Sequence, residues 1–168
     1  EPGNRTLMSR PAETSLDAVG DVLRSADLLL DTLRVTDVPV TGVCQDSRLA
    51  RDGDLFLAWQ GTTSDAHDFV AAAADQGAVA TLVERPLDLD IPQLVVSDGR
   101  RAAALVADFV MGQPSDKLLT VGVTGTNGKT TTAMLVRHLL NPTIPTAVIG
   151  TLGLIDREGV RKRTVGLT

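Results

Sequence analysis

One stretch in the second half of the chain limits the possible folds more than any other. The apolar, β-branched run 118–123 leads into a turn with glycines at 125 and 128, then Lys129, then threonines at 130–132, then an amphipathic run over 133–140. This order predicts a strand, a loop and a helix, with a cation at the helix start. Glycines let several backbone N–H groups face one anion, and the helix N-terminus adds the positive end of its dipole. The stretch therefore predicts a loop that binds the phosphates of a nucleotide.

Two side chains of this loop have expected roles of their own. Lys129 brings a full charge to the outer phosphates, and the Thr130 hydroxyl is placed to ligate the accompanying Mg²⁺. The strict P-loop spacing requires glycine at position 123, where Val123 stands, so the sequence fits a tighter variant of the motif. A Gly-rich turn with a solvated lysine is the alternative. We predict phosphate contacts from Gly125, Thr126, Asn127, Gly128, Lys129, Thr130 and Thr131.

The run 123–132 resembles the ATP-binding loop of the Mur ligases, which are cytoplasmic enzymes that build the peptide stem of peptidoglycan precursors. Within that family it is most similar to the MurE type, the UDP-N-acetylmuramoyl-tripeptide synthetases. The resemblance covers roughly residues 38–168. It implies ATP and Mg²⁺ as cofactors and a catalytic role for Lys129.

Composition excludes several other classes of protein. A net charge of −5 without a basic stripe argues against a nucleic-acid partner. No apolar run approaches the roughly 20 residues that a membrane helix needs. Cys44 is the single cysteine, which cannot form an internal disulfide and fits a reducing cytoplasm; we expect it to be a buried small hydrophobe. We therefore expect a cytoplasmic protein that forms no membrane contact and is a monomer.

Helical and strand patterns alternate, which predicts an α/β fold. We expect a disordered leader at 1–14, a Mur-ligase α/β domain at 15–115 that binds the UDP-sugar, and at 116–168 the start of a P-loop, Rossmann-like ATP-binding domain that is truncated. Ser15 is the expected N-cap of a helix that reaches Leu30, and Ser97 or Asp98 caps another. Strands are expected at 38–45, 55–59, 78–83, 93–96, 118–123 and 146–149.

The segment 45–48 lies where the first of these strands ends, so its polar side chains can bind an anion or a sugar edge at the mouth of the sheet. A capped turn with solvated Asp46 and Arg48 is an equally good interpretation. The motifs at 46–48, 53–56, 61 and 77–78 are similar to the domain of the MurE and MurF ligases that holds the uridine diphosphate of the substrate. That resemblance implies substrate contacts from Gln45, Ser47, Thr62, Thr63 and Ser64. We expect His67 to be a local hydrogen-bonding residue and His138 to be exposed.

Two short runs lie beyond the loop. Residues 150–153 form a plain turn or, by resemblance, the Gly-Thr-Leu-Gly run of the MurE type. The last residues resemble the opening of the family's substrate loop, which makes Thr168 a substrate contact. The family also uses acidic magnesium ligands, a modified lysine and a third domain, and none of these has a position in this sequence. We therefore expect the chain by itself to be inactive.

The resemblance implies an ATP-dependent amide ligase. Its substrates would be UDP-MurNAc-L-Ala-D-Glu and a third amino acid, diaminopimelate or lysine, joined through an acyl phosphate. A MurF-type ligase or folylpolyglutamate synthetase is one alternative. A non-catalytic module that binds a UDP-sugar is the other.

Overall fold

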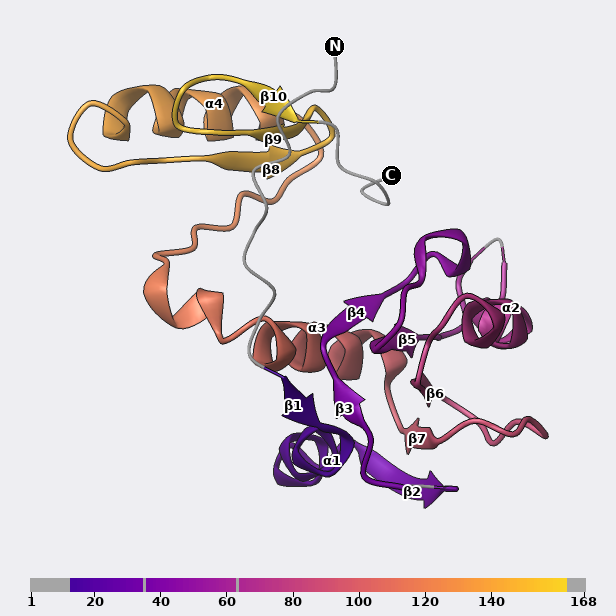
Figure 1. The fold of residues 1–168 in the computed structure, drawn as a ribbon. Coiled ribbons are helices and arrows are strands. Elements are labelled where there is room, and N and C mark those ends of the chain that lie inside the picture. The colour runs from indigo at the N-terminus through magenta and orange to yellow at the C-terminus, as the bar shows by residue number, and fades with distance from the viewer. Residues whose placement is uncertain (1–12, 35, 63, 163–168) are drawn as a thin grey trace, which may run out of the picture. The chain divides into compact units, whose positions relative to one another are not determined.

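The structure is a computed structural model that describes residues 13–34, 36–62 and 64–162. The chain divides into two compact units, Glu1–Leu118 and Leu119–Thr168. Unit 1 contains most of the regular structure, and unit 2 contains the Gly-rich loop and the helix after it (Figure 1).

Unit 1 is built on a five-stranded sheet with the strand order β2-β7-β6-β5-β4. Strands β4 to β7 run parallel to one another, and β2 pairs antiparallel with β7 at one edge. The fold is therefore α/β, as predicted, with a mixed sheet. The strands are β2 (Leu29–Leu33), β4 (Gly42–Cys44), β5 (Asp54–Leu57), β6 (Ala80–Val83) and β7 (Gln93–Val96).

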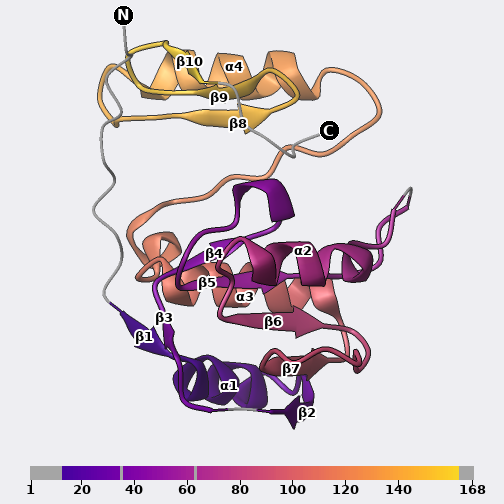
Figure 2. The ribbon, with the colours of Figure 1, turned by 45° about the vertical axis from the view of Figure 1, so that its right-hand side comes forward.

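Helices cover both faces of this sheet (Figure 2). Helix α1 (Leu16–Ser25) and helix α3 (Gly99–Val110) pack on one face, and the short helix α2 (Val70–Asp75) packs on the other. Leu55 and Leu57 of β5 belong to the core on the α1 and α3 side, whereas Phe56, between them, belongs to the core on the α2 side. Alternate residues of a strand point to opposite faces, so a strand covered on both sides is apolar throughout.

The predicted helix caps are confirmed, but the first helix is shorter than expected. The Ser15 side chain accepts a hydrogen bond from the Ala18 N–H at 3.1 Å, and Asp98 caps α3 by accepting from Arg101 N–H at 3.0 Å. Helix α1 ends at Ser25 because Asp27 adopts a left-handed conformation with φ of 56°. Leu29 and Leu30, which we expected in this helix, lie in β2 instead. Pairing with β7 outweighs the helical spacing of these leucines.

A two-residue ladder at the start of the described chain forms a small sheet that is separate from the five-stranded one. Strand β1 (Thr14–Ser15) pairs antiparallel with β3 (Pro39–Val40). The predicted leader therefore does not extend to Thr14, and its residues 1–12 lie outside the described residues. The predicted strand 38–45 is divided between β3 and β4, because Thr41 N–H bonds to Gly53 O at 2.8 Å between them.

Unit 2 packs helix α4 (Lys129–Leu140) against a three-stranded antiparallel sheet of order β10-β9-β8. Its strands are β8 (Val148–Gly150), β9 (Gly153–Ile155) and β10 (Arg161–Lys162). The Arg137 guanidinium donates to Asp156 O at 2.7 Å, which ties the helix to the turn after β9. Residues 151–152 form the turn between β8 and β9, with Gly153 at φ of 89°. Residues 150–153 are thus a hairpin turn here.

The predicted strand at 118–123 is wrong for this structure. No regular structure is assigned between Leu118 and Val123, and Leu118, Leu119 and Val121 are 66%, 92% and 63% exposed. A strand needs a neighbour for its N–H and C=O groups, and within residues 119–162 the assigned strands pair among themselves. Residues 118–123 have the sequence pattern of a strand, but among the described residues no neighbouring strand pairs with them.

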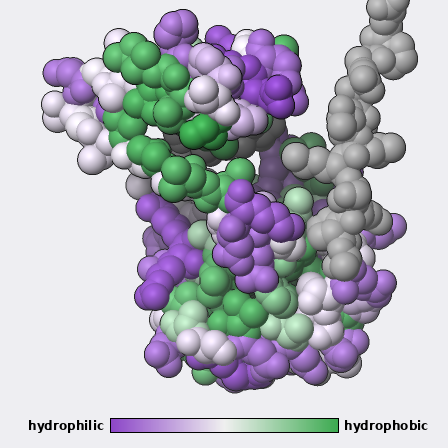
Figure 3. All heavy atoms as spheres, turned by 90° about the vertical axis from the view of Figure 1, so that its left-hand side faces the viewer, coloured by the Kyte–Doolittle hydropathy of each residue, from purple (hydrophilic) through white to green (hydrophobic). Residues whose placement is uncertain are grey.

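Apolar side chains gather at the surface of both units (Figure 3). Unit 2 exposes Leu135 and Leu139 on one side of α4 and Ile149 on β8. Among the described residues, no helix combines the length and the apolar character needed to cross a bilayer.

The core of unit 1 can be tested at Leu82, which is fully buried in β6. We expect Leu82→Ala to lower the free energy of unfolding by about 2–5 kcal/mol, because the lost side chain leaves a cavity that the sheet cannot close. Leu30→Ala is the matched control, since Leu30 is 65% exposed on the edge strand; we expect a change within about 0.5 kcal/mol. Urea unfolding followed by the fluorescence of the single tryptophan, Trp59, measures both. Equal losses for the two variants would contradict this core.

Candidate functional site

Four parallel strands deliver the loops that follow them to one edge of the unit 1 sheet. Strands β4, β5, β6 and β7 are parallel neighbours, so their carboxyl ends lie along the same edge. The segments that follow them are 45–48, 58–65, 84–92 and 97–98. In open α/β sheets this edge is where ligands bind. The five substrate residues predicted in unit 1 lie on the first two segments.

The segment after β4 is a compact turn. Asp46 is the N-cap of the 3₁₀ turn η1 (Ser47–Leu49) and accepts from Arg48 N–H at 3.1 Å. Its carboxylate also pairs with the Arg48 guanidinium through bonds of 2.8 and 2.6 Å, which lower the pKa of Asp46. Gln45 is exposed and Ser47 is half-buried. Asp46 and Arg48 thus shape the turn, on which Gln45 and Ser47 keep part of their surface exposed.

Cys44, at the end of β4, is buried as predicted, and its thiol donates to Asp46 O at 3.0 Å. Burial raises the pKa of this thiol. A neutral, buried thiol is a packing group rather than a nucleophile.

The segment after β5 forms a loop with a closed base and an exposed tip. Gln60 and Asp65 form an isolated antiparallel bridge, and Gly61 N–H bonds to Ser64 O at 2.9 Å. Thr62 and Ser64 are exposed at the tip. Thr63, the third predicted residue of this group, lies outside the described residues.

His67 is a hydrogen-bonding residue, as predicted, but its partners are not all local, and its side chain is 4% exposed. Its Nδ1 lies 2.5 Å from Asp65 Oδ1, and its Nε2 lies 2.9 Å from the Glu84 N–H. A backbone N–H only donates, so Nε2 must accept, and the proton of the neutral ring belongs on Nδ1, where it is donated to Asp65. His67 therefore connects the loop after β5 to the end of β6. His138 on α4 is exposed, as expected.

Asp65 also accepts from the Arg85 guanidinium, whose Nη2 lies 2.8 Å from Asp65 Oδ2. The hydrogen bonds from the His67 side chain and backbone and from Arg85 hold the pKa of Asp65 well below its usual range. This carboxylate is ionised at neutral pH and anchors the base of the loop.

Two of these anchoring residues were missed in the sequence, namely Glu84 and Arg85. Glu84 Oε2 accepts from Gln60 N–H and Oε1 accepts from Gly99 N–H, each at 2.9 Å. The available signal was two consecutive charged residues placed directly after the buried strand β6. Such residues mark the edge where a sheet meets its loops.

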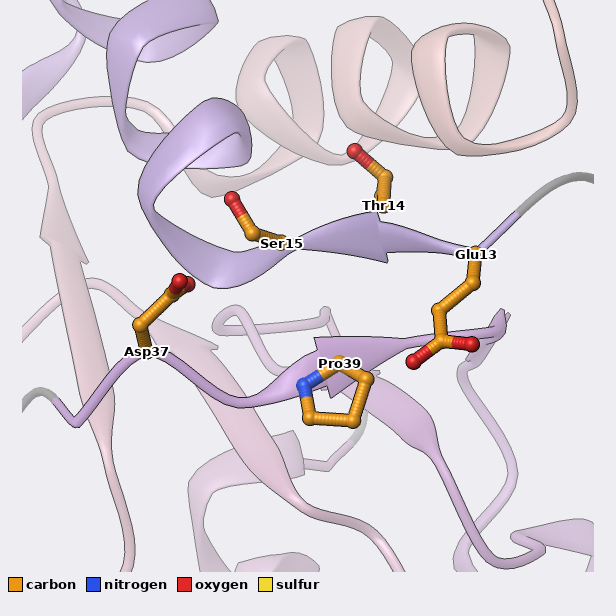
Figure 4. Close-up of a pocket in the computed structure, with 5 residues that line it drawn as sticks. All are labelled: Glu13, Thr14, Ser15, Asp37 and Pro39. Carbon is orange, nitrogen blue, oxygen red and sulfur yellow. The ribbon is translucent and has the colours of Figure 1, made fainter.

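A shallow depression of about 470 Å³ lies elsewhere in unit 1, beside the β1–β3 ladder (Figure 4). It is lined by Glu13, Thr14, Ser15, Asp37 and Pro39. Two carboxylates make this lining a poor match for a diphosphate. The edge of the five-stranded sheet is the better candidate for such a ligand.

The Gly-rich loop of unit 2 is open. Gly125 and Gly128 have φ of 144° and 77°, and a Cβ built on Gly128 would meet no atom within 4 Å. Gly128 is the N-cap of α4 and offers no side-chain acceptor to the first N–H groups of the helix. Thr126, Asn127, Thr130 and Thr131 are exposed around it. The loop therefore has space and N–H donors for an anion, and the Thr130 hydroxyl is accessible to a metal.

Lys129 begins α4 and folds back over the loop. Its Nζ donates to Gly125 O at 2.6 Å and to Thr126 O at 3.3 Å. The ammonium group thus lies at the loop that we expect to hold phosphates, where two backbone carbonyl oxygens hold it. Thr168, the last predicted substrate residue, lies outside the described residues.

Comparison with known families identifies the class. A family model described as "Mur ligase family, catalytic domain" matches residues 39–116, and one described as "Mur ligase middle domain" matches residues 123–166. The matched segments are consecutive and fall in units 1 and 2. The chain belongs to the Mur ligase family.

Individual relatives are more specific. A UDP-N-acetylmuramoyl-L-alanyl-D-glutamate–2,6-diaminopimelate ligase of Bacillus cereus is 42% identical over 116 residues, which are 68% of this chain and 24% of that protein. A solved structure of a ligase of the same name is similar with a TM-score of 0.65 and 26% identity over 84% of this chain and 28% of that one. MurF from Acinetobacter baumannii is similar with a TM-score of 0.63 and 30% identity over 85% of this chain and 31% of that one. The chain thus spans about a quarter of the length of the curated relative.

The anchoring of Asp65 predicts a pH dependence of stability. A carboxylate whose pKa is lowered by folding stabilises the folded state above its unfolded pKa of about 3.9, and this contribution is lost as the pH falls further. We expect the free energy of unfolding of the wild type to exceed that of Asp65→Asn most above about pH 5, and the difference to shrink below about pH 4. Urea unfolding at a series of pH values, followed by Trp59 fluorescence, measures it. Asp116→Asn, at an exposed position, is the control; a wild-type advantage over Asp65→Asn that persists unchanged to about pH 3 would contradict the assignment.

Proposed function

We propose that this chain is part of an ATP-dependent amide ligase of the MurE type, acting in the cytoplasm. The complete ligase adds the third amino acid to UDP-MurNAc-L-Ala-D-Glu. The observation that carries the proposal is the open Gly-rich loop at the start of α4, with Lys129 Nζ 2.6 Å from Gly125 O. The name of the B. cereus relative, which is 42% identical, supports diaminopimelate as the amino acid.

In unit 2, the loop holds the phosphates of Mg-ATP. Backbone N–H groups from Gly125 to Thr131 would hold the phosphates, and Lys129 would add a positive charge beside them. Open space at Gly128 and the uncapped start of α4 support this role. Thr130 would hold the metal ion, which supplies positive charge next to the phosphates.

In unit 1, the carboxyl edge of the sheet holds the uridine diphosphate of the sugar nucleotide. Gln45 and Ser47 come from the turn after β4, and Thr62, Thr63 and Ser64 come from the loop after β5. Hydroxyl and amide groups at such an edge orient phosphates without a large fixed charge. Thr168 would contact the same substrate.

The chemistry explains why such a ligase needs ATP. A carboxylate is a poor electrophile at neutral pH, because its leaving group would be oxide. The γ-phosphoryl group of ATP is transferred to the D-glutamate carboxylate, ADP leaves, and the amine then attacks the acyl phosphate and releases phosphate. Lys129 and the loop amides offset the charge on the phosphoryl group during its transfer.

A MurF-type ligase is the second candidate, because MurF of A. baumannii matches 85% of this chain with a TM-score of 0.63. The two candidates differ in the substrate of unit 1, since MurF acts on a sugar nucleotide that carries the longer peptide. Calorimetric titration of the 168-residue chain with UDP-MurNAc-L-Ala-D-Glu, the corresponding tripeptide and Mg-ATP tests the proposal. We expect binding of the dipeptide form and of Mg-ATP. Preference for the tripeptide form would favour MurF, and binding of the sugar nucleotide without Mg-ATP would favour a non-catalytic module.

Lys129 is the residue whose loss tests the nucleotide site most directly. In the complete ligase we expect Lys129→Ala to lower kcat by about 10²–10³-fold, which is the usual cost of losing one group that stabilises transition-state charge. Unit 1 should keep its wild-type unfolding curve. Lys162→Ala is the control in the same unit, since Lys162 lies 3.6 Å from Asp156 at the end of the small sheet. Wild-type turnover of Lys129→Ala would remove this residue from the mechanism.

A further inference from the structure

The loop 60–67 is held at both of its ends by two consecutive residues at the end of β6. At the start of the loop, Gln60 N–H donates to Glu84 Oε2 at 2.9 Å. At its end, Glu84 N–H donates to His67 Nε2 at 2.9 Å, and Arg85 Nη2 donates to Asp65 Oδ2 at 2.8 Å. The backbone and side chain of one residue, Glu84, thus hold both ends.

Glu84 also ties this loop to the start of helix α3, the helix that follows β7. Its second oxygen, Oε1, accepts from the N–H of Gly99, the first residue of α3, at 2.9 Å. The fit at this point is close, because a Cβ on Gly99 would lie 2.5 Å from Trp59 Cβ and 2.9 Å from Glu84 Oε1. One carboxylate therefore joins the segments that follow β5, β6 and β7.

The clamped loop has a tip that is free to meet a ligand. Gly61 N–H bonds to Ser64 O at 2.9 Å, and Thr62 and Ser64 are exposed. Glu84 is not itself a good contact for a diphosphate, because it is anionic and both of its oxygens already accept backbone N–H groups. The Glu84 carboxylate therefore stabilises the loop through these two hydrogen bonds and is not expected to contact the ligand.

We propose that Glu84 is a positioning residue for the sugar-nucleotide site, acting by fixing the two ends of this loop, at Gln60 and at His67, where it meets the sheet edge. The inference rests on the proposed function of unit 1. A loop that is already ordered loses less conformational entropy on binding, so its affinity depends on the residues that order it. Arg85 has the same role at the Asp65 end, with a smaller effect because its side chain is 49% exposed.

The test compares Glu84→Gln with Glu158→Gln in the 168-residue chain. Glutamine keeps the size of the side chain, but it has one acceptor oxygen and turns an NH₂ group toward a backbone N–H. We expect Glu84→Gln to weaken binding of UDP-MurNAc-L-Ala-D-Glu at least tenfold in calorimetry and to speed amide hydrogen exchange in residues 60–67. Binding of Mg-ATP should stay within twofold of the wild type. Glu158 is exposed in unit 2, and its variant should change neither affinity.

Arg85→Gln keeps the inference testable if Glu84→Gln does not fold. It releases only the Asp65 end, and we expect sugar-nucleotide binding to weaken three- to tenfold. Binding within twofold of the wild type, in Glu84→Gln or in a folded Arg85→Gln that replaces it, would overturn the inference. If the wild type itself does not bind the sugar nucleotide, the proposed function fails. Amide hydrogen exchange then tests the role of Glu84 separately. If residues 60–67 exchange at the same rate in Glu84→Gln as in Glu158→Gln, Glu84 does not hold the loop.

Discussion

Parallel pairing of β4, β5, β6 and β7 is the constraint on which the site in unit 1 depends. Because these strands point the same way, every turn that follows one of them emerges at a single edge. The turn after β4 brings Gln45 and Ser47 there, and the loop after β5 brings Thr62 and Ser64. The ladders between the strands set their register and helices cover both faces, so the edge is a firm base for short polar loops.

Sequence patterns were sufficient where local chemistry decides the structure. Asp98 caps the helix that follows it through its own side chain, so it could be predicted locally. The short buried strand β7 was predicted with its observed bounds, Gln93–Val96. Patterns failed where a distant partner decides. Leu29 and Leu30 have helical spacing, yet they lie in β2, because β7 pairs with Leu29 and with residues 31–33 on the other side of Leu30. The run 118–123 fails in the opposite way, since a strand pattern remains irregular when no strand pairs with it.

The same distinction between local and distant partners applies to the two candidate sites. The Gly-rich loop could be found from the sequence because its glycines, Lys129 and the following helix are consecutive in the chain. The clamp on loop 60–67 could not, because Glu84 lies 24 residues from Gln60 and 15 from Gly99, the two residues whose N–H groups it accepts. Only the parallel order of the strands brings these residues together. The role of His67 was expected to be local, yet its imidazole also reaches across to the end of the neighbouring strand.

Gly99 shows how closely this edge is assembled. A methyl group at this position would press on Trp59 from one side and on the Glu84 carboxylate from the other. Almost every single-nucleotide change in this codon that alters the residue would therefore push a side chain into the junction of three loops. Position 99 should be among the least mutationally tolerant in unit 1, although it offers no side chain to any ligand. A substitution of Gly99 that abolishes function could therefore act by displacing Glu84 and the loop that Glu84 holds, and not only by unfolding the domain.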